Sequence, residues 1–94
     1  MTYKLAFNES ALKEWKKLGH TIQEQFKKKL KERLQNPRIP ASQLYGRKDQ
    51  YKIKLRGAGY RLVYKVEDSI VTVTVIGVGK RENDDIYNAT QHRN

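Results

Sequence analysis

Residues 51–56 read Tyr-Lys-Ile-Lys-Leu-Arg, a strict alternation of apolar and cationic side chains. Because successive side chains of a β-strand point to opposite faces, this pattern predicts a strand with one apolar face and one cationic face. Three like charges on one face repel one another, so we expect an anionic group to bind there. Phosphate is the candidate that fits this face best.

Composition supports an anionic partner. The chain has 94 residues, which suffices for a single domain over 1–94 with one modest core, and its formal net charge is +10. A domain this basic typically binds nucleic acid, an anionic membrane surface or an acidic partner. The chain has no Cys, which excludes disulfides, thiolate nucleophiles and cysteine-ligated zinc.

Membrane and export signals are missing from the pattern. The longest apolar run, over 70–78, is interrupted by threonines and is too short to span a bilayer. No hydrophobic signal region follows Met1, so we expect a cytoplasmic protein with no membrane partner. A solvated basic face without any partner is the alternative interpretation of the charge.

The residues before the alternating strand predict a short strand and a first helix. Residues 3–7 alternate in polarity and indicate the strand. Asn8 is the expected N-cap of the helix, and Gly19 marks its expected end. The expected apolar stripe of this helix consists of Leu12, Trp15 and Leu18.

A second helix is predicted between Thr21 and Asn36. Thr21 and Glu24 have the spacing of a capping box. Asn36-Pro37 ends the helix, because proline cannot continue the hydrogen-bond ladder. The expected core stripe contains Ile22, Phe26, Leu30 and Leu34. The outer face is rich in cations, at Lys27, Lys28, Lys29 and Lys31, followed by Arg33.

Three further strands and a last helix complete the predicted order. The strands are expected near 51–56, 60–66 and 70–78, with turns at 57–59 and 67–69, and Asn83–Gln91 has the pattern of a short helix. The order β-α-α-β-β-β-α predicts an α+β fold. We expect a small antiparallel sheet with an N-terminal helical hairpin packed on one face, and a short C-terminal helix.

The register of the first hairpin decides which cations share a face. With 57–60 as a four-residue loop, the expected apolar pairs are Leu55 with Leu62, Ile53 with Tyr64 and Tyr51 with Val66. This register places Arg61 and Lys65 on the open cationic face with the strand lysines. A slip of one residue would bury both cations, which is costly, so we reject it.

Most familiar catalytic sets are missing from the sequence. His20 lies between the helices and His92 near the last residue, which disfavours a two-histidine ribonuclease mechanism and a His/carboxylate metal site. Asp84 and Asp85 fit the first turn of a helix. Gly57-Ala58-Gly59 fits a hairpin turn and not a phosphate-binding loop. We therefore expect no metal and no cofactor.

Lysine, arginine and tyrosine remain as candidate reactive side chains. RNA carries its own nucleophile, the ribose 2′-hydroxyl, so its cleavage needs a base, stabilisation of charge on phosphorus and help for the leaving oxygen. Lys52 and Lys54 lie on one strand face, and each disfavours the protonated form of the other. An anionic substrate opposes that effect, so a lysine base is a hypothesis at this point.

Several segments together resemble the RelE family of bacterial toxins within the RelE/ParE superfamily. They are 11–15 (Ala-Leu-Lys-Glu-Trp), 51–56, 59–64 (Gly-Tyr-Arg-Leu-Val-Tyr) and 78–82 (Val-Gly-Lys-Arg-Glu), followed by Tyr87, and the resemblance covers nearly the whole chain. It implies a metal-independent endoribonuclease, an mRNA interferase that cuts the codon in the ribosomal A site. The products would be a 2′,3′-cyclic phosphate and a 5′-hydroxyl.

The resemblance also implies a catalytic set, made of Lys52, Lys54, Arg61, Arg81 and Tyr87. Lys54 would act as the base, Lys52 would stabilise the phosphate and Arg61 would stabilise the developing charge. Arg81 would stabilise the leaving oxygen electrostatically, because a guanidinium is a poor acid. Tyr87 would pack on a substrate base and orient it.

Further cations are expected to contact ribosomal RNA, with an affinity that falls as salt rises. They are Lys27, Lys28, Lys31, Arg33, Arg56, Lys65 and Lys80. Tyr45 departs from the family pattern, because relatives often carry a basic residue there. The implied partners are the ribosome and an acidic, RelB-like antitoxin that displaces the C-terminal helix, with DNA bound only through the antitoxin complex.

Two other functions stay open at the level of sequence. One is a ParE-like toxin that inhibits gyrase with the same fold and without ribonuclease activity. The other is a non-catalytic module that binds duplex RNA by shape, as basic α/β domains commonly do.

Overall fold

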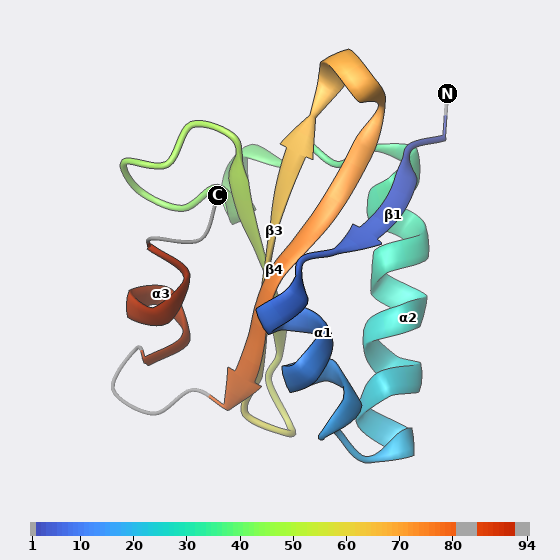
Figure 1. The fold of residues 1–94 in the computed structure, drawn as a ribbon, viewed down its shortest axis with the longest axis vertical. Coiled ribbons are helices and arrows are strands. Elements are labelled where there is room, and N and C mark those ends of the chain that lie inside the picture. Colours follow the sequence, from blue (N-terminus) through green and yellow to red (C-terminus); the bar gives the residue numbers. More distant parts are fainter. Residues whose placement is uncertain (1, 81–84, 92–94) are drawn as a thin grey trace.

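A computed structural model describes residues 2–80 and 85–91 of the chain (Figure 1). The predictions for Arg81, Asn83, Asp84 and His92 lie outside the described residues. The main elements are β1 (Lys4–Phe7), α1 (Glu9–Lys16), α2 (His20–Gln35), β2 (Gln50–Leu55), β3 (Tyr60–Glu67), β4 (Thr72–Lys80) and α3 (Asp85–Thr90). Short 3-10 turns lie at Pro40–Ser42 and Asp68–Ile70.

The strands form one sheet, with α1 and α2 on one side and α3 on the other (Figure 1). The strand order is β1-β4-β3-β2, and β2, β3 and β4 pair antiparallel as expected. β1 pairs parallel with β4, so the sheet is mixed, and the expectation of a wholly antiparallel sheet is wrong. The predicted α+β fold is confirmed. No described helix has the length and apolar character needed to cross a membrane.

The expected register of the first hairpin is wrong by two residues. Leu55 pairs with Tyr60, Ile53 with Leu62 and Tyr51 with Tyr64. The chain turns one residue earlier than expected, because Gly59 adopts a φ of 71° and its N–H donates to the Leu55 carbonyl at 2.8 Å. A shift of two residues keeps every side chain on its predicted face, since the period of a strand is two.

The helix ends differ in part from the predictions. The Asn8 side chain accepts a hydrogen bond from the Ala11 N–H at 2.7 Å, so this N-cap is confirmed. α1 ends at Lys16, and Gly19 is the N-cap of α2, so the capping box expected at Thr21 is wrong. α2 does end before Asn36-Pro37. His20 is exposed, as expected, but it is the first residue of α2.

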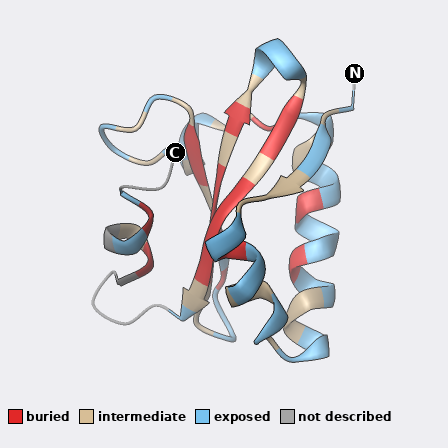
Figure 2. Ribbon diagram, in the orientation of Figure 1, coloured by how far each residue is buried: buried red, intermediate tan, exposed pale blue. Residues whose placement is uncertain are grey.

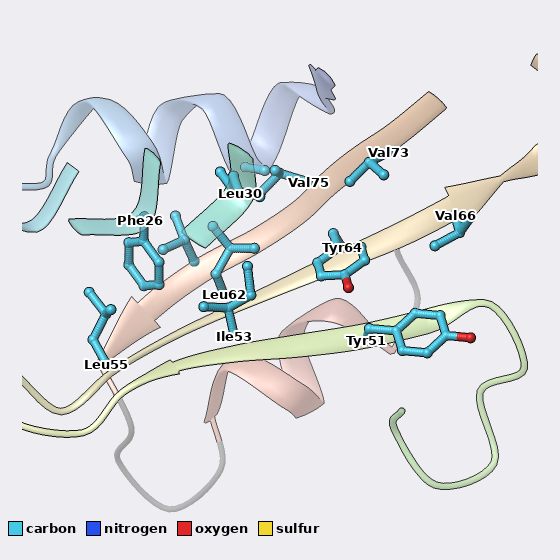
Figure 3. Close-up of a cluster of buried hydrophobic side chains, with 12 residues drawn as sticks. Phe26, Leu30, Tyr51, Ile53, Leu55, Leu62, Tyr64, Val66, Val73 and Val75 are labelled. Carbon is cyan, nitrogen blue, oxygen red and sulfur yellow. The ribbon is translucent and has the colours of Figure 1, made fainter. Parts of the chain in front are cut away.

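The main core lies between α2 and the sheet (Figure 3). Phe26 and Leu30 of the predicted stripe are fully buried there, whereas Leu12 of the first predicted stripe is 38% exposed. Figure 2 shows burial concentrated on β2 to β4 and on the inner face of α2. The buried members of this core from the sheet are Tyr51, Ile53, Leu55, Leu62, Tyr64, Val66, Val73, Val75 and Val78.

Arg33 belongs to this interface and not to the exposed lysine-rich face, which corrects the sequence interpretation. Its guanidinium donates to the Tyr64 hydroxyl at 2.9 Å and to Ser42 Oγ at 3.2 Å. The Tyr64 hydroxyl donates in turn to the Pro37 carbonyl at 2.7 Å. Burial raises the pKa of Tyr64, which keeps this hydroxyl protonated as a donor. The hydrogen bonds of Arg33 therefore link α2 and the following loop to β3.

The second face of the sheet carries a smaller apolar cluster under α3. Val63 of β3 and Ile76 of β4 are buried against Ile86 of α3, and Leu44 and Tyr87 pack at the edge of the cluster. The face opposite α2 is therefore partly covered, whereas the sequence predicted it to be open.

The Leu30→Ala variant should lower the free energy of unfolding by about 2–5 kcal/mol, because it leaves a cavity in the main core. The matched Leu12→Ala variant should change it by less than about 1 kcal/mol, since Leu12 is 38% exposed. Urea denaturation of both variants measures the difference. Equal losses would contradict the assignment of Leu30 to the core and Leu12 to the surface.

The pH dependence of stability should have a contribution from Asp68. Hydrogen bonds from the Tyr3 hydroxyl and the Arg38 guanidinium hold the pKa of Asp68 below its ordinary value. The carboxylate therefore stabilises the fold above its unfolded pKa, and this contribution is lost as the pH falls through the lower, folded pKa. Asp68→Asn should make the unfolding midpoint less dependent on pH in acid, as followed by denaturation at a series of pH values. An unchanged pH profile would contradict this role.

Candidate active site

The two strand lysines occupy the sheet face opposite the main core. Tyr51, Ile53 and Leu55 of β2 point into that core, so the alternating Lys52 and Lys54 point away from it. Lys54 is exposed and Lys52 is half-buried. The predicted division of this strand into an apolar and a cationic face is confirmed by the burial pattern.

Arg61 of β3 lies directly opposite Lys54 on the neighbouring strand. The two residues are register partners in the β2–β3 ladder, and Lys52 pairs with Val63 in the same ladder. Directly opposed residues have Cβ atoms about 4.5–5.5 Å apart, so two cationic side chains start from neighbouring positions on one face. Two cations arranged in this way suit a bound anion.

Arg61 is buried, contrary to the expectation of an open position. Its exposed fraction is 6%. Its Nη1 donates to the backbone carbonyl of Tyr60 at 3.1 Å. Among the described residues, its buried Nε has no hydrogen-bond partner. A desolvated guanidinium with so few acceptors is costly for the protein alone, and an anionic ligand would satisfy it.

Tyr87 lies above the same face, on α3. It packs against the cluster of Val63, Ile76 and Ile86. Val63 is two residues from Arg61 on β3 and therefore lies on the same face of the sheet. The structure thus brings Lys52, Lys54, Arg61 and Tyr87 to one side of the sheet, with α3 as the element that positions the aromatic ring. Arg81 lies outside the described residues.

The remaining predicted RNA contacts fall into two groups. Lys27, Lys28 and Lys31 are exposed on α2, on the opposite side of the sheet from α3, and Lys27 lies 3.4 Å from Glu24. Arg56 and Lys80 are exposed at the end of the sheet near Gly59, and the Lys80 ammonium sits 5.9 Å from the Tyr60 ring centroid. Lys65 is half-buried and pairs with Gln50 at the other end of β2.

Lys29 lies near Lys54 in the structure. It lines a shallow depression of about 610 Å³ with Lys54, Arg56 and the hairpin turn. Its position in the lysine run of α2 was the only signal in the sequence. The edge of β2 therefore joins cations from a helix and a strand.

Arg47 is a second residue that the sequence analysis did not single out. It donates hydrogen bonds to Thr90 Oγ1 at 2.9 Å and to the backbone carbonyl of Tyr87.

Among the described residues, no three His, Asp or Glu side chains gather to form a candidate metal site.

The fold and the cationic face agree with the small toxins of the RelE/ParE type that the sequence resembles. A family model described as "ParE toxin of type II toxin-antitoxin system, parDE" matches residues 5–85. The chain belongs to this family of type II toxins.

Individual relatives are similar over their whole length. The mRNA interferase toxin RelE of Escherichia coli K12 is 58% identical over 93 residues, which cover 99% of this chain and 98% of the relative. A mutant of E. coli toxin RelE, solved in the free state, superposes with a TM-score of 0.92 at 57% identity, covering 99% of this chain and 98% of that one. A complex of an E. coli RelE mutant with an antitoxin RelBc peptide gives a TM-score of 0.84 at 56% identity, covering 100% and 99% of the two chains.

Replacing Arg61 should not lower the free energy of unfolding, which would indicate that this arginine serves function and not stability. Arg61→Met should leave the free energy of unfolding unchanged or raise it by up to about 3 kcal/mol, because it removes a buried cation with an unsatisfied donor. Arg38→Met is the matched control and should lower it, since Arg38 bridges Asp49 and Asp68. Chemical denaturation gives both values, and a large loss for Arg61→Met would show that this guanidinium stabilises the fold.

Proposed function

We propose that this protein is the toxin of a type II toxin-antitoxin system and acts as a ribosome-dependent mRNA interferase. The observation that carries the proposal is the register pair of Lys54 and Arg61, a pair of like charges on one sheet face, one of them buried. Two cations that start from neighbouring positions on one face suit the binding of a phosphate. The identity of 58% to a protein described as an mRNA interferase supports the same reaction.

The reaction needs no nucleophile from the protein. The 2′-hydroxyl of the substrate attacks the adjacent phosphorus, the bond to the 5′-oxygen breaks, and the released 5′-oxygen takes a proton from water. The products are a 2′,3′-cyclic phosphate and a 5′-hydroxyl. Lys54 is proposed to accept the 2′-hydroxyl proton, and Lys52 and Arg61 to stabilise the charge that develops on the phosphorane. Arg81 is proposed to stabilise the leaving oxygen, and Tyr87 to hold the neighbouring base.

Dependence on the ribosome follows from the weakness of this chemistry. The set contains no histidine and no strong base, so the 2′-oxygen, the phosphorus and the leaving oxygen must already be in line. A ribosome that holds the message in its A site provides this alignment. The exposed lysines of α2 and the cations around Lys54 are proposed to bind ribosomal RNA phosphates, in a cytoplasmic setting.

The proposed restraining partner is an acidic antitoxin similar to RelB. Solved relatives at 56–62% identity include complexes of E. coli RelE with its antitoxin. A formal net charge of +10 on this chain favours a disordered acidic segment that folds on binding. Binding of DNA is proposed only for the toxin-antitoxin complex.

Loss of the proposed base should abolish cutting without unfolding the protein. In a translation extract, Lys54→Ala should slow A-site cleavage of a message by about 100-fold or more, the range expected for a lost general base. Primer extension on the message, with and without ribosomes, measures the cleavage. Lys16→Ala is the matched control, because it removes one exposed lysine from α1, and it should cut at the wild-type rate.

The cleavage experiment separates the competing functions when it is combined with assays of DNA supercoiling and of duplex RNA binding. Wild-type cleavage by Lys54→Ala would overturn the assigned base. A wild-type protein that never cuts messages but blocks DNA supercoiling by gyrase would be a ParE-like inhibitor. Tight binding of duplex RNA without cleavage on ribosomes would indicate a binding module.

A further inference from the structure

The loop before β2 and helix α3 are joined through one side chain, that of Arg47. Its Nη1 donates to Gln50 Oε1 at 3.1 Å and to Thr90 Oγ1 at 2.9 Å. Its Nη2 donates to the backbone carbonyl of Tyr87. The guanidinium therefore connects Gln50, the first residue of β2, to Tyr87 and Thr90 of α3.

α3 depends on contacts of this kind. It has only six residues, Asp85–Thr90, and a helix this short is not stable by itself in water. Ile86 anchors its first turn in the apolar cluster on Val63 and Ile76. Within the helix, the Thr90 hydroxyl donates to the Tyr87 carbonyl at 3.1 Å. A cation near the carbonyl groups of a last helical turn is favourable. Arg47 supplies that cation.

The contacts of Arg47 at the end of α3 are partly buried. Thr90 has an exposed fraction of 0%, and its hydroxyl also contacts the Ile86 carbonyl at 2.9 Å. Hydrogen bonds to a charged donor are stronger than neutral ones, particularly where solvent is excluded. Arg47 is thus placed to contribute more to the seating of α3 than its position in a surface loop suggests.

The loop that carries Arg47 is itself fixed to the sheet. The Leu44 N–H donates to the Gln50 carbonyl at 2.9 Å, and the Gln50 N–H donates to the Arg47 carbonyl at 3.3 Å. Leu44 packs with Tyr87 on the same apolar cluster. The loop therefore provides a rigid base from which the guanidinium reaches α3.

We propose that Arg47 is a positioning residue that fastens α3 to the sheet and so holds Tyr87 over the face of Lys52, Lys54 and Arg61. Arg47 acts through the backbone of Tyr87 and does not itself touch the RNA. The effect on cutting rests on the proposed function of Tyr87. The fastening of α3 does not, so the two parts can be tested separately.

Hydrogen exchange tests the fastening without any assay of activity. In Arg47→Met, deuterium uptake over residues 85–91 should become about tenfold faster, while uptake over β3 and β4 stays at the wild-type rate. In Arg47→Lys, deuterium uptake over 85–91 should be faster than in the wild type and slower than in Arg47→Met. One ammonium cannot reach all three acceptors of the guanidinium. Unchanged uptake over 85–91 in both variants would overturn the proposal.

The control for charge is Lys48→Met. It removes one exposed cation from the same loop and should leave uptake over 85–91 at the wild-type rate. Equal acceleration in Lys48→Met and Arg47→Met would attribute the effect to the charge of the loop and overturn the proposal. If Arg47→Met does not fold, Arg47→Lys decides, since it too must accelerate exchange over 85–91 alone.

A double-mutant cycle tests the consequence for cutting at saturating ribosomes. Arg47→Met should reduce the cleavage rate about tenfold, and Arg47→Met combined with Tyr87→Ala should cut no more slowly than Tyr87→Ala alone. If the double variant loses the product of the two single losses in cleavage rate, Arg47 acts on the RNA directly, and its role through Tyr87 is overturned. A Tyr87→Ala variant that cuts normally would instead refute the proposed function of Tyr87, while the exchange result would still decide whether Arg47 fastens α3.

Discussion

The antiparallel pairing of β2 with β3 is the interaction on which both the core and the candidate site depend. On one face it sets Ile53 against Leu62 and Tyr51 against Tyr64, under α2. On the other face the same ladder sets Lys54 against Arg61. The apolar face stabilises the sheet, and the same ladder places these two cations at neighbouring positions on the other face.

α3 changes the character of the cationic face. It covers Val63 and Ile76 and brings Tyr87 to the side of the sheet that carries Arg61. Electrostatic interactions strengthen as water is removed, so the cover increases the attraction of the face for phosphate. Because a six-residue helix has little stability of its own, this cover depends on Ile86 at one end and Arg47 at the other. A partner that removes α3 would also expose Val63 and Ile76 to water.

The local patterns predicted the elements well and the long-range contacts poorly. Alternation over 51–56 identified the strand and its two faces, and the spacing of Phe26 and Leu30 identified the buried side of α2. The register of the hairpin failed because the left-handed φ of Gly59 is invisible in a hydrophobic pattern. Arg33 and Arg47 appeared as ordinary surface cations, since their acceptors lie far along the chain, on Tyr64, Tyr87 and Thr90.

The parallel pairing of β1 with β4 has a consequence for the order of synthesis. Residues 4–7 find their partners only at 72–75, and the intervening helices and strands must be made first. The first strand therefore leaves the ribosome with no neighbour, and the sheet closes only when β4 has emerged. We expect the nascent chain to stay without its complete four-stranded sheet through most of translation.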